Sequence, residues 1–140
     1  MIPKFRAWDK LTDTIQDVLD INFLEKTVTV SQKDIVWYKH DNLRPFKGVI
    51  LMQSTGLKDK NGVEIFEGDI VAFEDSDGGY EYQDIVINTG IVEYGELGFY
   101  FTNRVAVDMD DFYIKDGRCD DVEVIGNIYE NPELLSSGIE

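Results

Sequence analysis

The chain has 140 residues, 43% of them hydrophobic, and a formal net charge of −15, which is the composition of a soluble globular protein with one domain or two small subdomains. Its single cysteine, Cys119, excludes an intrachain disulfide, and no apolar run approaches the roughly 20 residues of a membrane helix. The first ten residues also lack the apolar stretch of a signal peptide. We therefore expect a cytoplasmic protein without membrane association.

Charge is divided unevenly along the chain. Residues 1–60 contain 10 Lys/Arg and 8 Asp/Glu, a net charge of +2, whereas residues 61–140 contain 3 Lys/Arg and 20 Asp/Glu, a net charge of −17. Such acidity argues against direct nucleic-acid binding by the second part of the chain. It also serves solubility, so charge alone identifies no partner.

Short runs of β-branched and aromatic residues, separated by Gly, Asn and Asp, predict an all-β fold. Alternation predicts strands in residues 4–8 and 21–31, the second as one strand or as two around Glu25–Lys26. Residues 11–20 stay ambiguous, because helical spacing and a capping-box pattern compete with β-branched residues that disfavour a helix. Farther along, we expect a strand at 35–38 and a loop at 42–45.

The segment Leu51–Val71 is rich in turns and predicts the centre of a small β fold. Asn61–Gly62 predicts a hairpin with a type I′ turn, which needs positive φ at both residues. Gly68–Asp69 predicts a second tight turn, with Asp69 holding backbone amides in it.

The second half continues with predicted strands and turns, and it ends in a short helical turn at Asn131–Glu133, where Asn is a favoured cap and Pro a favoured first residue. One long strand, bent or bulged near Gly90, suggests a small closed or half-closed barrel of SH3-like type. The strands expected from this half are 70–73, 84–94, 99–102, 112–114 and 122–129.

Three segments together resemble the YopX family of bacteriophage and prophage proteins. They are Pro3–Lys10 (PKFRAWDK), Leu51–Val71 (LMQSTGLKDKNGVEIFEGDIV) and Glu123–Leu135 (EVIGNIYENPELL). Ser54 departs from the family, which usually has an aromatic residue there, and residues 32–49 match no pattern of it.

The resemblance implies an N-terminal β-rich subdomain, residues 1–50, joined to an SH3-like barrel, residues 51–140. It also implies a phage or prophage origin. It supplies no activity, no cofactor and no catalytic residue.

No arrangement of residues in the sequence indicates catalysis or a metal site. Cys119 and His40 are too few for structural zinc, and the carboxylates beside Cys119 should raise the pKa of its thiol. Two acidic runs fail the calcium-loop pattern and are read as solvated loops. These runs are Asp75, Asp77 and Glu81, and Asp108, Asp110 and Asp111. We expect no enzyme and no cofactor.

The best candidate contact surface is polar and lies in and around the Leu51–Val71 segment. The competing interpretation is that these side chains only form turns and face solvent. The candidates are Gln53, Thr55, Lys58, Asp59, Glu67 and Asp69.

Two functions fit these features. The first is a non-enzymatic phage accessory protein that binds an unknown host or phage protein, in a sharper form as an acidic DNA mimic. The second is a small regulatory or single-strand nucleic-acid-associated factor, although net charge makes nucleic acid an unfavourable partner. It would use Lys4, Arg6, Lys10, Arg44 and Lys47 with Trp8, Trp37 and Tyr38. Self-assembly through an exposed strand is compatible with either function.

Overall fold

The structure is a computed structural model and is mainly β. Its antiparallel strands form two compact units, residues 1–54 and residues 55–140. Among the residues described, no helix is long and apolar enough to cross a membrane. The structure describes residues 4–33, 35, 37, 40–76, 85–95, 98–103, 112–113 and 122–135.

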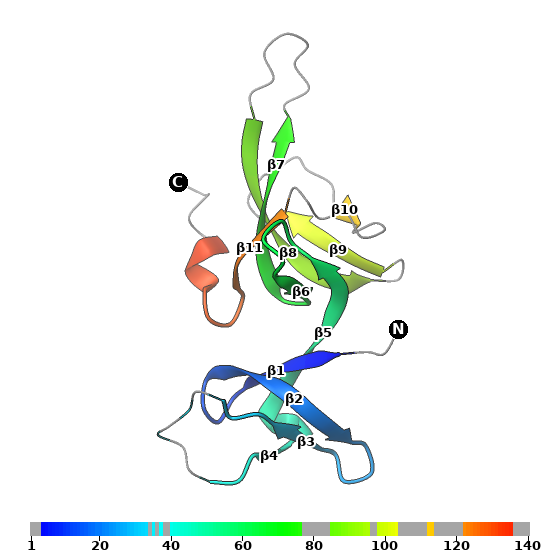
Figure 1. Ribbon diagram of the computed structural model, residues 1–140, viewed down its shortest axis with the longest axis vertical. Helices are drawn as coiled ribbons and strands as arrows, with labels where there is room; N and C mark the ends of the chain where they lie inside the picture. Colours follow the sequence, from blue (N-terminus) through cyan, green and yellow to red (C-terminus); the bar gives the residue numbers. More distant parts are fainter. Residues whose placement is uncertain are drawn as a thin grey trace. The chain divides into compact units, whose positions relative to one another are not determined.

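The first unit is an antiparallel sheet whose strands follow one another in the order β4-β3-β2-β1-β5 (Figure 1). Its core is the buried group Ala7, Val28, Val30 and Val49, against which Val18, Phe46 and Leu51 pack. Strand β5 begins in this unit and continues into the second. The elements are β1 (Phe5–Asp9), β2 (Thr14–Asn22), β3 (Thr27–Val30), β4 (Leu43–Pro45), the 3-10 turn η1 (Phe46–Gly48) and β5 (Val49–Lys58).

The helical alternative for residues 11–20 is wrong, because this segment holds most of β2. Residues 14–17 of β2 pair with β1, and residues 18–22 pair with β3. Pairing on both sides outweighs the helical spacing, and the β-branched residues of the segment favour a strand. Asp13, which would have capped the helix in the helical alternative, instead has a left-handed backbone in the turn before β2.

Two further expectations in this unit meet different outcomes. The loop expected at residues 42–45 is wrong, because Leu43–Pro45 forms the short edge strand β4. Its proline has no N–H to donate and is tolerated because β4 is an edge strand of the sheet. The strand expected at residues 35–38 is absent at Ile35 and Trp37, and the other two positions lie outside the described residues.

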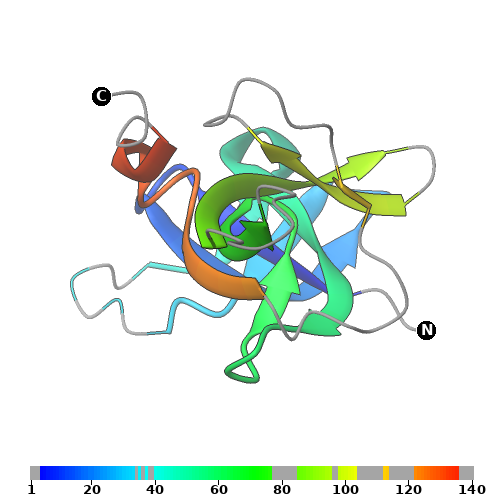
Figure 2. The same cartoon turned by 90° about the horizontal axis from the view of Figure 1, so that it is seen from above.

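The second unit contains a sheet with strand order β10-β9-β8-β7-β11. Strand β8 pairs with β7 through residues 85–91 and with β9 through residues 90–95, without a register shift. It therefore has no bulge in these pairings, and its curvature is visible from two directions (Figures 1 and 2). The elements are β6 (Glu64–Phe66), β7 (Asp69–Ser76), β8 (Ile85–Gly95), β9 (Gly98–Asn103), β10 (Phe112–Tyr113), β11 (Val122–Asn127) and the 3-10 turn η2 (Pro132–Leu135).

The sheet of the second unit does not close among the described residues. Strands β10 and β11 are its two edges, and no pairing joins them there, so the closed SH3-like barrel is not confirmed. The hairpin of β5 and β6 packs on this sheet through one core of Ile65, Val71, Val92 and Val122, with Leu57 and Val124 beside it.

Candidate functional site around the β5–β6 hairpin

The hairpin turn between β5 and β6 is a type I turn followed by a glycine bulge. The Gly62 N–H donates to the Asp59 carbonyl (3.0 Å), and the Asp59 N–H donates to the Val63 carbonyl (2.8 Å). Only Gly62 has positive φ (+81°) in this turn, so the predicted type I′ turn, which also needs positive φ at Asn61, is wrong. A three-residue loop of this kind has its glycine at the third position, as here.

The carboxylate of Asp59 organises this turn and reaches beyond it. Its Oδ1 accepts the N–H groups of Asn61 (2.8 Å) and Val63 (2.9 Å). Its Oδ2 accepts the Val124 N–H of strand β11 (2.9 Å), and the Lys60 N–H donates to the Val122 carbonyl (2.9 Å). The hairpin therefore satisfies two backbone groups on the outer edge of β11, and a covered edge cannot pair with another chain.

These contacts also set the charge state of Asp59. The side chain is 6% exposed, and desolvation by itself raises the pKa of the carboxyl. The hydrogen bonds from Val124, Val63 and Asn61, together with the charge of Lys60, outweigh desolvation and hold the pKa below its ordinary value of 3.8. Asp59 is thus a structural anion and has no role as a proton donor near neutral pH.

Asp69 also accepts a backbone N–H in a turn, here the turn between β6 and β7, as predicted. It is 1% exposed, and its Oδ2 accepts the Phe66 N–H (2.7 Å). The preceding Gly68 has φ of +86°, donates its N–H to the Val92 carbonyl (2.8 Å) and accepts the Ile128 N–H (3.0 Å). This turn therefore ties β6, β8 and the segment after β11 together.

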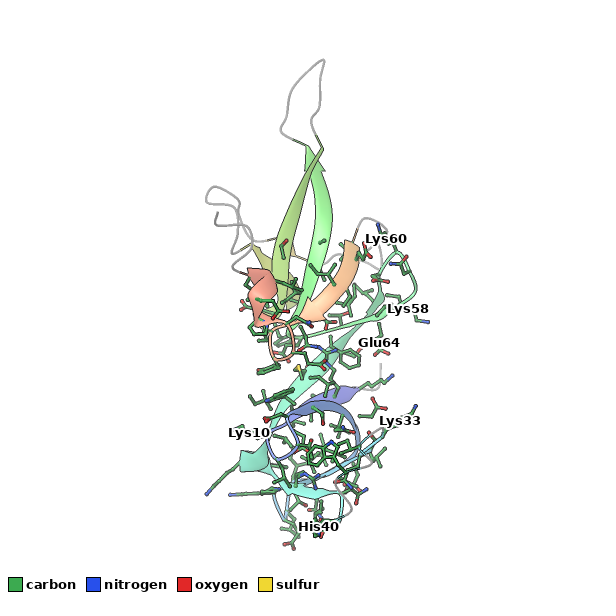
Figure 3. All side chains as sticks on the ribbon, turned by 90° about the vertical axis from the view of Figure 1, so that its left-hand side faces the viewer. Lys10, Lys33, His40, Lys58, Lys60 and Glu64 are labelled. Carbon is green, nitrogen blue, oxygen red and sulfur yellow. The ribbon has the colours of Figure 1, made fainter. Side chains whose placement is uncertain are left out.

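The other candidate residues divide between the interior and the surface. Thr55 is buried, donates its hydroxyl to the Ile65 carbonyl (2.8 Å) and accepts the Leu57 N–H (3.1 Å). Lys58 is exposed and points away from its strand (Figure 3), while Gln53 and Glu67 are half-buried. Gln53 belongs to the first unit, so the candidates form no single described surface. A contact role for Gln53, Lys58 and Glu67 stays a prediction.

Two hydrogen-bonded asparagines, Asn127 at the end of β11 and Asn131, were not predicted. The Asn127 Oδ1 accepts the N–H groups of Tyr129 (3.0 Å) and Glu130 (2.8 Å). The short helical turn was predicted correctly, but the Asn131 Oδ1 accepts the Asn127 N–H (3.2 Å), in the reverse direction to the expected cap. Gly126 makes room for it, because an added Cβ would lie 2.5 Å from that oxygen. The spacing of the two asparagines within Glu123–Leu135 is the signal that could have indicated this pair.

A buried ion pair joins β1 and β4 of the first unit and was also missed. The Arg44 Nε lies 3.1 Å from both carboxylate oxygens of Asp9, and the two side chains are 2% and 0% exposed. Arg44 also donates to the carbonyls of Asp41 and Leu43 and to the Gln32 side chain. Arg44 therefore holds both ends of the segment between β3 and β4, and it is unavailable to the surface proposed for nucleic acid.

The remaining residues considered for catalysis or metal binding are mostly outside the described side chains. His40 is exposed, whereas Cys119 and the carboxylates of both acidic runs lie outside the described side chains. Within the part of the chain that the structure describes, no three His, Cys, Asp or Glu residues form a group that could hold a metal.

Comparison with known proteins identifies a matching family and a similar solved structure. A family model described as YopX protein matches residues 4–136. The crystal structure of protein EF1440 from Enterococcus faecalis is similar with a TM-score of 0.62 and 30% sequence identity, over 96% of this chain and 99% of that chain. No curated protein matches the chain.

Proposed function

Because the chain belongs to the YopX family, as the three sequence segments predicted and the match over residues 4–136 confirms, we propose that it is a phage-type accessory protein acting by protein–protein interaction and not as an enzyme. An SH3-like form of the second unit, a type of fold common in partner recognition, belongs to the same proposal. Fold alone does not establish function, so the residues of the chain must support the proposal.

The observation that carries the proposal is how the buried carboxylates are used. Asp9 is paired with Arg44, while Asp59 and Asp69 accept backbone N–H groups. A catalytic acid or base must reach a substrate proton within hydrogen-bond distance, and these three groups are instead committed to holding turns and strands. Their use supports an interaction module built on a stable scaffold.

The acidity of residues 61–140 supports a sharper form of the proposal, in which this half imitates DNA toward a basic host protein. DNA-binding proteins typically contact about 6–10 phosphates. The 20 carboxylates of this half exceed that number, even though Asp69 is buried and removed from the surface. A mimic needs only about half of the remaining groups on one face.

A pull-down tests both levels of this proposal. Tagged protein is incubated with host lysate at low and at high salt, with and without competing duplex DNA. We expect capture of a basic DNA-binding protein that salt weakens and DNA displaces. Capture that ignores salt and DNA would refute the mimic and leave the interaction module, whereas no specific capture would count against the module itself.

Charge-reversal variants sharpen the pull-down. The variant E67K/E133K changes two carboxylates of the acidic half, the half-buried Glu67 and the exposed Glu133, and D17K/D20K makes the same charge change on exposed positions of β2. Only the first should weaken capture if the acidic half is the contact surface.

The alternative of single-strand nucleic-acid binding keeps one supporting observation, because Trp37 is 65% exposed and could stack on a base. The burial of Arg44 removes one of its expected phosphate contacts. A gel-shift assay with single- and double-stranded DNA at low salt decides it, and no shift at about 10 µM protein would end it.

A further inference from the structure

The turn of the β5–β6 hairpin holds the one Asn-Gly pair of the sequence, Asn61–Gly62. Both residues are exposed, and nothing lies within 4 Å of the position that a Cβ on Gly62 would take. In such a pair the backbone nitrogen of the glycine can attack the side-chain amide carbon of the asparagine, because glycine has no side chain to hinder the approach. The attack closes an imide ring and removes the amide, so the pair is a chemically reactive point of the turn.

Hydrogen bonds of the turn oppose this reaction while the turn is closed. The Gly62 N–H donates to the Asp59 carbonyl (3.0 Å), which occupies the nitrogen that must attack. The Asp59 Oδ1 also accepts the N–H groups of Asn61 (2.8 Å) and Val63 (2.9 Å). The reaction therefore requires the turn to open, and an exposed turn opens locally at a lower free energy than the whole domain unfolds. The Asp59 carboxylate thus controls how often Asn61 can react.

We propose that Asn61 is a site of spontaneous deamidation and that its modification releases the hairpin from the outer edge of β11. The Gly62 nitrogen forms a bond to the Asn61 Cγ and loses its proton, while the Cγ–Nδ2 bond breaks and the side-chain nitrogen leaves with that proton as ammonia. Water then opens the imide at either of its two carbonyls. The products at position 61 are aspartate and isoaspartate, and no oxidant or enzyme is required. This inference goes beyond the proposed function and does not depend on it.

Either product disturbs the turn that Asp59 organises. Both place a new carboxylate two residues from the buried Asp59 anion, and like charges repel. Isoaspartate also lengthens the main chain by one methylene before Gly62, inside the loop that the Asp59 carboxylate holds. The same turn covers β11, because the Asp59 Oδ2 accepts the Val124 N–H (2.9 Å) and the backbone of Lys60 donates to that strand (Figure 3). A disturbed turn therefore uncovers a strand edge that can pair with another chain.

Incubation of the full chain at mildly alkaline pH, followed by peptide mapping with mass spectrometry, tests the site. Asn61 should gain the mass that separates a carboxyl from an amide before any other asparagine does. Two asparagines of the same chain are internal controls: Asn22 is exposed but precedes the bulky Phe23, and Asn131 precedes a proline, which has no N–H to lose. Faster conversion at either control would overturn the proposal. So would an unconverted Asn61 in folded protein after a urea-unfolded sample has converted completely.

Substitution of Asp59 tests whether the turn controls the rate. Asp59→Ala removes the carboxylate that closes the turn and should accelerate conversion of Asn61 at least about tenfold. Asp20→Ala removes an exposed carboxylate of β2 and should convert at the rate of the unaltered protein. Circular dichroism checks the fold, and Asp59→Ser, which keeps one acceptor oxygen, replaces Asp59→Ala if that variant fails to fold. A folded Asp59 variant that converts no faster than Asp20→Ala would refute control by the turn.

Amide hydrogen exchange of the converted protein tests the release of β11. Anion exchange separates this protein from unconverted chains by its additional negative charge. Exchange at the amides of Val124 and Lys60 should be faster than in freshly prepared protein, whereas the amide of Val28, in the core of the first unit, should exchange as before. Asn61→Asp carries the new charge without the added methylene and should accelerate exchange less than isoaspartate does. Unchanged exchange at Val124 and Lys60 in the converted protein would overturn the release.

Discussion

Replacing Asp59 with alanine removes the acceptor of three backbone hydrogen bonds and should destabilise the second unit. The Val124 N–H is the costliest loss, because it lies on a half-buried strand edge that water reaches poorly. A hydrogen bond to a charged group contributes about 1.5–3 kcal/mol, and the exposed turn amides of Asn61 and Val63 can recover water. We therefore expect the free energy of unfolding to fall by about 2–4 kcal/mol, a large share of the roughly 5–15 kcal/mol of a typical domain.

The assay must report on the second unit by itself. The two tryptophans, Trp8 and Trp37, both lie in residues 1–54, so their fluorescence follows the first unit. Urea unfolding followed by far-UV circular dichroism covers the whole chain, and amide hydrogen exchange at Val124 and Lys60 follows the covered edge of β11. Asp59→Ala should accelerate exchange at both amides while leaving the tryptophan transition in place.

Asp20→Ala is the matched control, since it removes one exposed carboxylate from β2 and should change the free energy of unfolding by less than about 0.5 kcal/mol. Two results would refute the reasoning. They are an Asp59→Ala variant as stable as this control, and unchanged exchange at Val124.

The same carboxylate should make the free energy of unfolding depend on pH. The pKa of Asp59 is lowered in the folded state, so its ionised form adds stability that is fully present above the unfolded-state pKa. This contribution is lost as the pH falls through the folded-state pKa, which lies below 3.8. The difference in unfolding free energy between the unaltered protein and Asp59→Asn should therefore narrow below pH 3.8, and a constant difference would contradict the assignment.

Three further substitutions test the turns and the buried ion pair by urea unfolding. Arg44→Met leaves the Asp9 carboxylate buried without its partner and should lower the free energy of unfolding, followed by tryptophan fluorescence, by about 3–5 kcal/mol. Adding Asp9→Leu should recover most of this loss. An equal loss in the single and the double variant would argue against an uncompensated charge. Gly126→Ala should cost about 1–3 kcal/mol, because its Cβ would lie 2.5 Å from the Asn131 Oδ1, and no extra cost is expected when Asn131 is also alanine. Gly62→Ala should cost about 1–2 kcal/mol through φ of +81° alone, since nothing lies within 4 Å of its added Cβ, and Gly62→Asn should cost less.

Local patterns predicted what depends on local interactions. Alternation identified β1 and β3, and the Asn-Pro-Glu run identified the turn η2. The role of Asp69 also followed from its place in a tight turn, because its acceptor contact is to an amide three residues away. Each of these elements is specified by neighbours within a few positions.

Contacts between residues that are far apart in the sequence explain the predictions that were wrong. Residues 11–20 have helical spacing, but pairing with β1 and β3 makes most of them a strand. Asp9 and Arg44 are 35 positions apart, and nothing in either local pattern links them. Asn61–Gly62 indicated a hairpin correctly, but the carboxylate of Asp59 accepts two N–H groups within the turn that forms, and its third contact is 65 positions away.

That long separation bears on how the protein is made. Translation at about 5–20 residues per second leaves about 3–13 s between the synthesis of Asp59 and that of Val124. During this interval the hairpin exists without the strand edge that it will cover, and Ile65 lacks Val122 in its core. The first unit, by contrast, has all its strand partners once Ser54 has been added. The growing chain thus completes its balanced-charge unit early and its acidic unit last, so a ribosome that stalls in between presents an apolar hairpin to chaperones and proteases.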